Sequence, residues 1–126
     1  MPNVYTNHKA KLANTNLTTI YTVPTAKTAI IKSIRVANED TSNDCNITVT
    51  LVDTSDVIYM IEKDRTIQAK RSQELLATGN MAQDSADSSV AGPTPLIAKE
   101  SEIIKAQAEN ANDLSIIISV LEISDV

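Results

Sequence analysis

The chain has 126 residues, a net charge of −5, one cysteine, and three aromatic residues, all of them tyrosines. This length corresponds to one domain, a lone cysteine excludes an intrachain disulfide framework, and no apolar run approaches the roughly 18 residues of a membrane helix. The scarcity of aromatic rings argues against carbohydrate platforms and against binders that stack nucleic-acid bases.

The first sixteen residues are rich in asparagine and threonine and alternate only weakly. They predict an extended N-terminal arm over residues 1–16, with short strands near Val4 and Ala10, followed by a single domain over residues 17–126. Such an arm is not stable alone, so we expect it to lie on the domain or on a partner. The start lacks the charged and apolar regions of a signal peptide, and we expect synthesis and folding in a cytoplasm.

Two strands are predicted next, at residues 17–23 and 28–38. In the second, Ile30, Ile34 and Val36 share one phase, and Ile31 falls out of it. Either a bulge resets the phase or this strand is partly buried on both faces.

The cleanest alternation of the chain lies at residues 47–52. A four-residue turn at 53–56 then leads into the apolar segment 57–61, which predicts an antiparallel hairpin. The charged residues 63–65 are expected to close this hairpin, and residues 66–71 to form another short strand.

Residues 77–93 form a long polar stretch that holds both glycines of the chain, and loops of this length are usually functional or mobile. Further strands are predicted at 94–98, 102–108 and 113–123. The last of these is rich in β-branched residues and reads as a central strand, because one of its faces is entirely apolar: Leu114, Ile116, Ile118 and Val120.

Seven to nine short strands separated by turn residues predict an all-β fold, an antiparallel β-sandwich or jelly roll. A parallel α/β sheet is excluded, because no helical segments separate the strands.

Few residues of the chain are candidates for catalysis or for binding a metal or phosphate. His8 lies in the polar arm and is expected to be solvated, Cys45 reads as a small buried thiol, and no glycine-rich phosphate loop is present. Two acidic loops lack the ligand spacing of a calcium loop and are read as solvated turns: Glu39, Asp40 and Asp44, and Asp53 and Asp56. A pair of carboxylates in a cleft is the remaining catalytic alternative, and we predict no enzyme, metal or cofactor.

Charge is divided unevenly along the chain. The first 38 residues carry five basic residues and no acidic one, whereas the remainder carries six basic and sixteen acidic residues. Such a division often marks a docking surface, and the candidate residues are Lys9, Lys11, Lys27, Lys32 and Arg35. The overall acidity disfavours nucleic acid as the partner.

Several segments resemble small virion structural proteins of tailed bacteriophages, including marine ones: MPNVYTN at 1–7, IYTVP at 20–24, TAIIKSI at 28–34, ESEIIK at 100–105, and the strand at 116–123. The resemblance covers most of the chain except residues 77–93, a loop that is longer here than in that type of protein. It implies a β-sandwich that assembles into particles.

From this resemblance we expect a capsid decoration (cement) protein on the outer capsid surface, located in the virion, with the five basic residues facing the shell. Its partners would be the major capsid protein or other virion proteins and further copies of itself, with a trimer favoured. The alternatives are a neck, tail or fibre-attachment component, and a receptor- or glycan-binding sandwich module.

Overall fold

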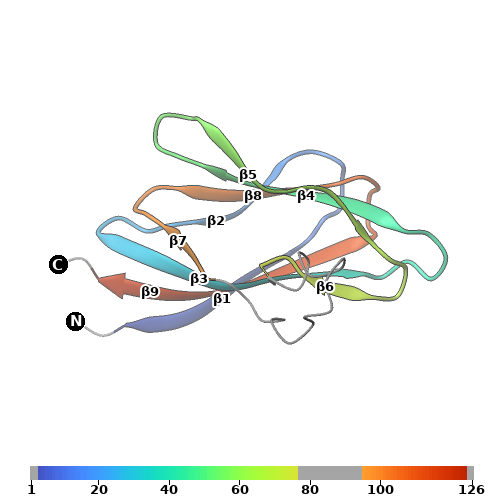
Figure 1. Ribbon diagram of the computed structural model, residues 1–126, viewed down its shortest axis with the longest axis horizontal. Coiled ribbons are helices and arrows are strands. Elements are labelled where there is room, and N and C mark those ends of the chain that lie inside the picture. Colours follow the sequence, from blue (N-terminus) through green and yellow to red (C-terminus); the bar gives the residue numbers. More distant parts are fainter. Residues whose placement is uncertain (1–2, 77–94, 125–126) are drawn as a thin grey trace, which may run out of the picture.

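The computed structural model describes residues 3–76 and 95–124, so the predicted loop at 77–93 lies outside the described residues. These residues form nine strands in two antiparallel sheets stacked face to face (Figure 1), which confirms the predicted all-β sandwich. The strands are β1 Val4–Lys11, β2 Thr18–Thr22, β3 Lys27–Asn38, β4 Cys45–Val52, β5 Ile58–Ile67, β6 Ser72–Glu74, β7 Leu96–Ala98, β8 Ile103–Ala108 and β9 Leu114–Ser124. Within the described part of the chain there is no helix that could cross a membrane.

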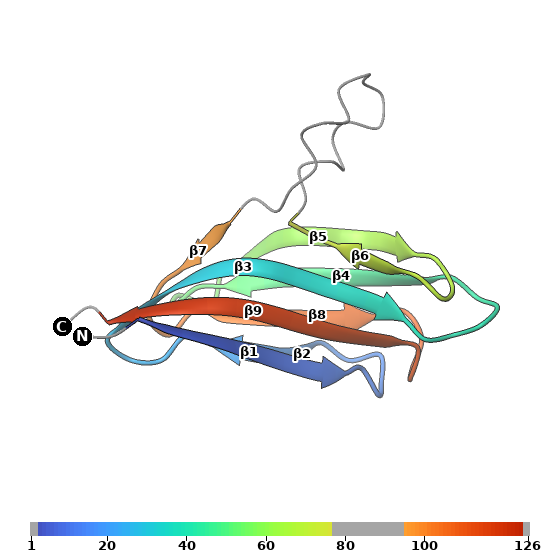
Figure 2. The same ribbon diagram turned by 90° about the horizontal axis from the view of Figure 1, so that it is seen from below.

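One sheet has five strands in the order β1-β9-β3-β6, with the short strand β7 pairing a different stretch of β3. The other has four strands in the order β2-β8-β4-β5. Figure 2 shows β1, β9 and β3 running side by side over much of the length of the molecule, with both chain ends at the same end of the sandwich. The shared end places residues from the first and last strands close together.

Strand β9 is the centre of the five-stranded sheet, as its sequence predicts, because β1 pairs with one edge and β3 with the other. Its inward residues Leu114, Ile116, Ile118 and Val120 are all buried. They pack against inward residues of the other sheet, such as Ile47, Val49 and Ile104. With few aromatic rings available, the core is filled by β-branched side chains, leucine and alanine, which suit a pleated surface.

Strand β3 contains the bulge that was one of the two predicted alternatives. Its pairing with β9 shifts between Ile31 and Ser33, so Ile31 faces the core before the shift and Ile34 and Val36 face it afterwards. The extra residue, Lys32, is exposed. A bulge therefore resets the alternation and brings a lysine to the outer face of the sheet.

Residues 4–11 of the expected arm form one continuous strand, β1, where the sequence suggested two short ones. This strand pairs residue by residue with β9, from Val4 opposite Glu122 to Lys11 opposite Ser115. The segment is thus an edge of the sandwich itself. Its weak alternation in sequence reflects polar residues on the outer face and only partly buried ones on the inner face.

The hairpin of β4 and β5 is confirmed, as is the strand assignment for residues 103–108. The predicted end of the hairpin at residues 63–65 is wrong, and so is the separate strand at 66–71. Strand β5 continues to Ile67, because a register shift between Glu62 and Arg65, with a left-handed backbone at Asp64 (φ 50°), absorbs the charged residues without ending the pairing.

Candidate interaction surface

The outer face of the five-stranded sheet is organised by the alternation of β9. Every second residue of this strand points away from the core, beginning with Ser115, Ile117, Ser119 and Leu121. Residues directly opposite each other in neighbouring strands share a face. The registers with β1 and β3 therefore fix which side chains form rows across this surface.

One row places a cation on each side of an isoleucine and ends at Glu74 of β6, which lies opposite Arg35. Lys9 of β1 and Arg35 of β3 both lie opposite Ile117, which is 43% exposed. The Arg35 Nη1 donates a hydrogen bond to Ser72 Oγ at 3.3 Å, so its guanidinium is held near the sheet. The row presents two cations on either side of an exposed isoleucine.

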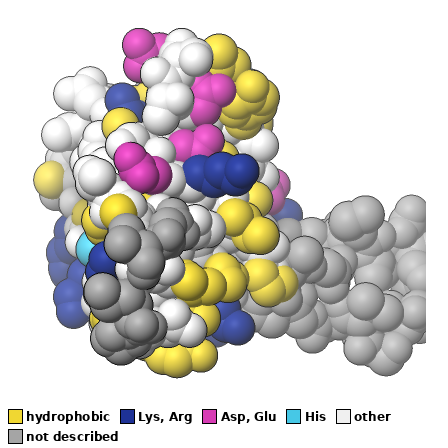
Figure 3. Space-filling model, turned by 90° about the vertical axis from the view of Figure 1, so that its left-hand side faces the viewer, with side chains coloured by type: hydrophobic (Ala, Val, Ile, Leu, Met, Phe, Trp, Pro, Cys, Tyr) yellow, Lys and Arg dark blue, Asp and Glu magenta, His cyan; other side chains and the backbone are white. Residues whose placement is uncertain are grey.

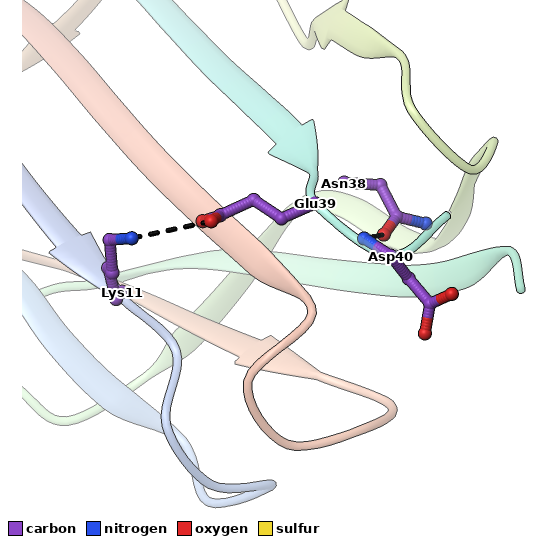
Figure 4. Close-up of polar contacts among 4 residues, drawn as sticks. All are labelled: Lys11, Asn38, Glu39 and Asp40. Atoms are coloured by element: carbon purple, nitrogen blue, oxygen red, sulfur yellow. Dashed lines mark hydrogen bonds and ion pairs between the residues drawn. The ribbon is translucent and has the colours of Figure 1, made fainter. Parts of the chain in front are cut away.

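Two further cations belong to the same face. Lys11 lies one row along from Lys9, and its Nζ forms an ion pair with Glu39 Oε1 at 3.3 Å (Figure 4). Lys32, the bulge residue, lines a shallow hollow of about 360 Å³ together with Tyr5, Asn7 and Ser119. We call this surface, defined by Lys9, Lys11, Lys32 and Arg35, the basic face.

Lys27 does not belong to the basic face. It stands at the first position of β3, and its Nζ lies 3.5 Å from Glu122 Oε1, a carboxylate that is only 10% exposed. The structure thus brings together four of the five basic candidates and places the fifth in a partly buried ion pair at the end of the sandwich.

A second row on this face is apolar. Tyr5, Leu121, Ile30 and Ile97 follow one another across β1, β9, β3 and β7. Tyr5 is 74% exposed and Ile97 is 59% exposed. Sequence reasoning missed this row, because it joins four strands whose registers are set only in the folded sheet.

Charge is unevenly distributed at one end of the sandwich. In the end-on view of Figure 3, acidic side chains lie in the upper half, on the side of the four-stranded sheet, and most lysines and arginines lie in the lower half. At this end of the molecule, the acidic side chains therefore lie apart from most of the basic ones. A partner approaching the basic face meets mainly positive charge.

A polar cluster is buried behind this face, between the two sheets. The Tyr21 hydroxyl donates a 2.6 Å hydrogen bond to Glu122 Oε2, and the His8 ring lies 4.3 Å from the Tyr21 ring. Burial raises the pKa of Tyr21 well above its ordinary value, and the hydrogen bond to Glu122 and its negative charge raise it further. Tyr21 therefore stays protonated and acts as a hydrogen-bond donor.

The expectation that His8 is solvated is wrong. His8 faces inward from β1, opposite Ile118, and its Nε2 is buried without a hydrogen-bond partner. The error arose from the polar composition of the segment, which hid the fact that alternate residues of an edge strand still face the core.

In the two acidic loops, aspartate side chains accept hydrogen bonds from the backbone of their own turns. Asp40 Oδ1 accepts hydrogen bonds from the backbone N–H groups of Ser42 and Asn43, which lower the Asp40 pKa, and Asp53 Oδ1 accepts two from its own turn. Within residues 3–76 and 95–124, no three His, Cys, Asp or Glu side chains are grouped to hold a metal ion. Cys45 is buried, as predicted, and burial raises the pKa of its thiol.

The tip of the β4–β5 hairpin is a second exposed apolar feature, and sequence reasoning did not identify it. Four consecutive residues, Val57, Ile58, Tyr59 and Met60, are 46%, 53%, 52% and 54% exposed. Their sequence looks like a core strand. Their exposure follows from their position beyond the edge of the packed sheets, at the upper left of Figure 1.

Comparison with known proteins finds distant structural likenesses. One is to the acidic stable capsid structure of Helicobacter pylori bacteriophage KHP30, at 14% identity and a TM-score of 0.44, covering 98% of this chain and 89% of the other. Another is to the structure of infectious bursal disease virus, Gt strain, at 4% identity and a TM-score of 0.37, covering 98% of this chain and 31% of the other. No protein-family model and no curated protein matches the sequence. Likenesses this distant show no family, and the function has to be argued from the chain itself.

Proposed function

We propose that this chain is a virion structural protein of a tailed bacteriophage, and specifically a capsid decoration protein that binds the outer capsid surface through its basic face. The sequence resemblance supports the class of protein. The observation that carries the orientation is the gathering of Lys9, Lys11, Lys32 and Arg35 on one outer sheet face, with exposed apolar residues between them.

Such a surface suits a flat, acidic partner. Ile117, Tyr5 and Ile97 supply apolar area that is buried on contact, and burial of apolar area is the main favourable term in association. The surrounding lysines and arginine steer the approach and set the orientation, and their attraction to an acidic surface weakens as salt screens it. The four-stranded sheet would face the solvent.

A neck, tail or fibre-attachment role is the second candidate, because the same face would serve a flat partner elsewhere in the virion. The number of copies in the isolated assembly separates the two roles. A trimer, which matches the local symmetry axes of a capsid, supports decoration, and a larger ring supports the neck or tail.

The test is binding to capsids that lack this protein. Deletion of residues 1–16 is not a clean probe, because it removes β1 and leaves an edge of β9 unpaired. The double substitution Lys9→Glu with Lys32→Glu changes two exposed lysines of the basic face. Its matched control, Lys63→Glu with Lys105→Glu, reverses two lysines of the four-stranded sheet.

We expect the basic-face variant to bind at least about tenfold more weakly, because each reversed charge replaces an attraction by a repulsion. The control variant, which has the same net charge, should bind nearly as tightly as the parent chain. Equal binding by all three proteins, or equal loss in both variants, would overturn the assignment of the basic face.

A further inference from the structure

The edges of the two sheets are protected to very different degrees. An edge strand offers unpaired backbone groups to any other strand, and natural proteins block such edges with charges, prolines, bulges or short strands. Strand β1 carries Lys9 and Lys11, β2 has only five residues and is followed by Pro24, and β6 and β7 have three residues each. Each of these edges carries a recognised form of protection.

Strand β5 is protected along only part of its length. Its second half carries Glu62, Lys63, Asp64 and Arg65 and contains one register shift, and a second shift falls at Ile61, between the pairs that Met60 and Glu62 form with β4. The segment Val57–Ile61, which we call the open edge, has no charge and no proline, and most of its side chains are about half exposed. Among the described strands, β5 pairs only with β4.

The hydrogen-bond pattern of the hairpin shows which backbone groups face outward. Asp53 N donates to the carbonyl oxygen of Val57 at 3.0 Å, so this opposed pair is hydrogen-bonded. Hydrogen-bonded and non-hydrogen-bonded pairs alternate along an antiparallel ladder, and the pairing of Leu51 with Tyr59 is therefore hydrogen-bonded as well. The N–H and C=O groups of Ile58 and Met60 accordingly point away from β4, toward the open edge.

We propose that the open edge binds the open edge of a second copy of this chain, in antiparallel register around a twofold axis at Tyr59. In this register Ile58 pairs with Met60 of the second copy, and Val57 lies opposite Ile61 of the second copy. The outward N–H and C=O groups of Ile58 and Met60 become paired. The two four-stranded sheets become one continuous sheet.

A second copy fits this edge because the partner must be an extended, uncharged, apolar strand with unpaired backbone groups of its own. The open edge is such a strand, and an interface that is the same patch on both subunits is what twofold symmetry requires. A shift of the axis to Met60 would place Ile58 opposite the Glu62 carboxylate. The register centred on Tyr59 opposes apolar to apolar from Val57 to Ile61.

The contact is small, which predicts a weak and reversible dimer in the micromolar to submillimolar range. Asp56 and Glu62 of opposite copies come near each other at its two ends. Added salt should screen this repulsion and tighten the dimer. Binding through the basic face should weaken under the same conditions.

The experiment measures the mass of the purified full chain by sedimentation equilibrium, from about 1 μM to about 1 mM, to span this range. Met60→Pro removes an outward N–H that β4 does not use, and proline is tolerated at such edge positions. Met60→Lys places a charge at the same point and serves if the proline variant does not fold. Leu17→Lys is the control, since it adds the same charge at an exposed leucine before β2, outside the open edge and the basic face.

We expect the parent chain and Leu17→Lys to dimerise alike, and both Met60 variants to raise the dissociation constant at least about tenfold. A chain that stays monomeric throughout, a dimer or trimer that both Met60 variants leave intact, or a continuous ladder of aggregates would each overturn the proposal. The measurement uses the isolated chain, so its failure is distinct from any failure to bind capsids.

Discussion

Strands β9 and β5 are alike in sequence and different in position. Both are long, with eleven and ten residues, and both contain a run of isoleucine, valine or other apolar residues. Strand β9 has a partner on each edge, and its inward residues are fully buried. Strand β5 has one partner, and its apolar beginning is about half exposed.

The difference shows that apolar composition alone does not bury a strand. Burial depends on how many neighbours pair with the strand and on whether a second sheet covers it. Strand β9 has both. The beginning of β5 extends past the core at the hairpin tip, and we expect β9 to stabilise the fold and the tip of β5 to serve recognition.

The largest expected effect is on the free energy of unfolding. Ile118→Ala should destabilise the protein by about 2–5 kcal/mol, because it leaves a cavity at a fully buried position of β9. Met60→Ala, at a side chain that is 54% exposed, should change stability by less than about 0.5 kcal/mol. Urea unfolding of dilute protein, where dimers do not form, measures both.

Comparable losses in the two variants would break the comparison, because they would mean that the hairpin tip is part of the stabilising core. A change in the denaturant slope of Ile118→Ala would instead indicate a less compact native or denatured state.

The sequence predicted the parts of the fold that depend on local alternation and turn chemistry. The central position of β9 followed from an apolar face and the β4–β5 hairpin from two runs around a four-residue turn, whereas the break in phase at Ile31 left a bulge as one of two alternatives. The path of β5 past residue 63 was not predictable in this way. Charged residues normally end a strand, and only the register shifts allow the pairing to continue.

The candidate surface was predicted in part. The charge division of the sequence pointed to Lys9, Lys11, Lys32 and Arg35, and the fold gathers them on one face. Lys27 could not be separated from them, because its ion pair with Glu122 joins residues far apart in the chain. The apolar row and the open edge depend on the order of the strands in the sheets. The alternation of apolar and polar residues along the sequence does not determine that order.

The end of β9 differs from β5 in a further way, because a hydrogen bond from the Tyr21 hydroxyl to Glu122 joins it to the opposite sheet. Tyr21→Phe should cost about 1–3 kcal/mol near neutral pH, since a buried carboxylate loses a hydrogen bond. The folded-state pKa of Tyr21 is raised, so its contribution is fully present below the unfolded pKa of about 10 and is lost as the pH rises toward the folded value.

The check is urea unfolding of both proteins at several pH values from about 7 to about 11. The difference in unfolding free energy between the parent chain and Tyr21→Phe should shrink above about pH 10. A difference that is constant across this range would show that Tyr21 ionises equally in both states, and would contradict its burial beside Glu122.

The smallest expected effect concerns the turns that lead into the two sides of the sandwich. Ala26 precedes β3, the neighbour of β9, with a left-handed backbone (φ 63°), and Asp56 precedes β5 with the same angle. Alanine pays a steric cost of roughly 1 kcal/mol in this region, whereas aspartate tolerates it better. Ala26→Gly should therefore stabilise the protein by about 0.5–1 kcal/mol, and Asp56→Gly by less.

Thermal unfolding of the two variants ranks their stabilities. Both variants keep the backbone N–H of residue 26, which donates to Glu100 Oε1 at 2.9 Å in the parent chain. A larger gain in stability from Asp56→Gly than from Ala26→Gly would contradict this ranking. It would mean that the backbone of the hairpin turn before β5 is more strained than that of the turn before β3.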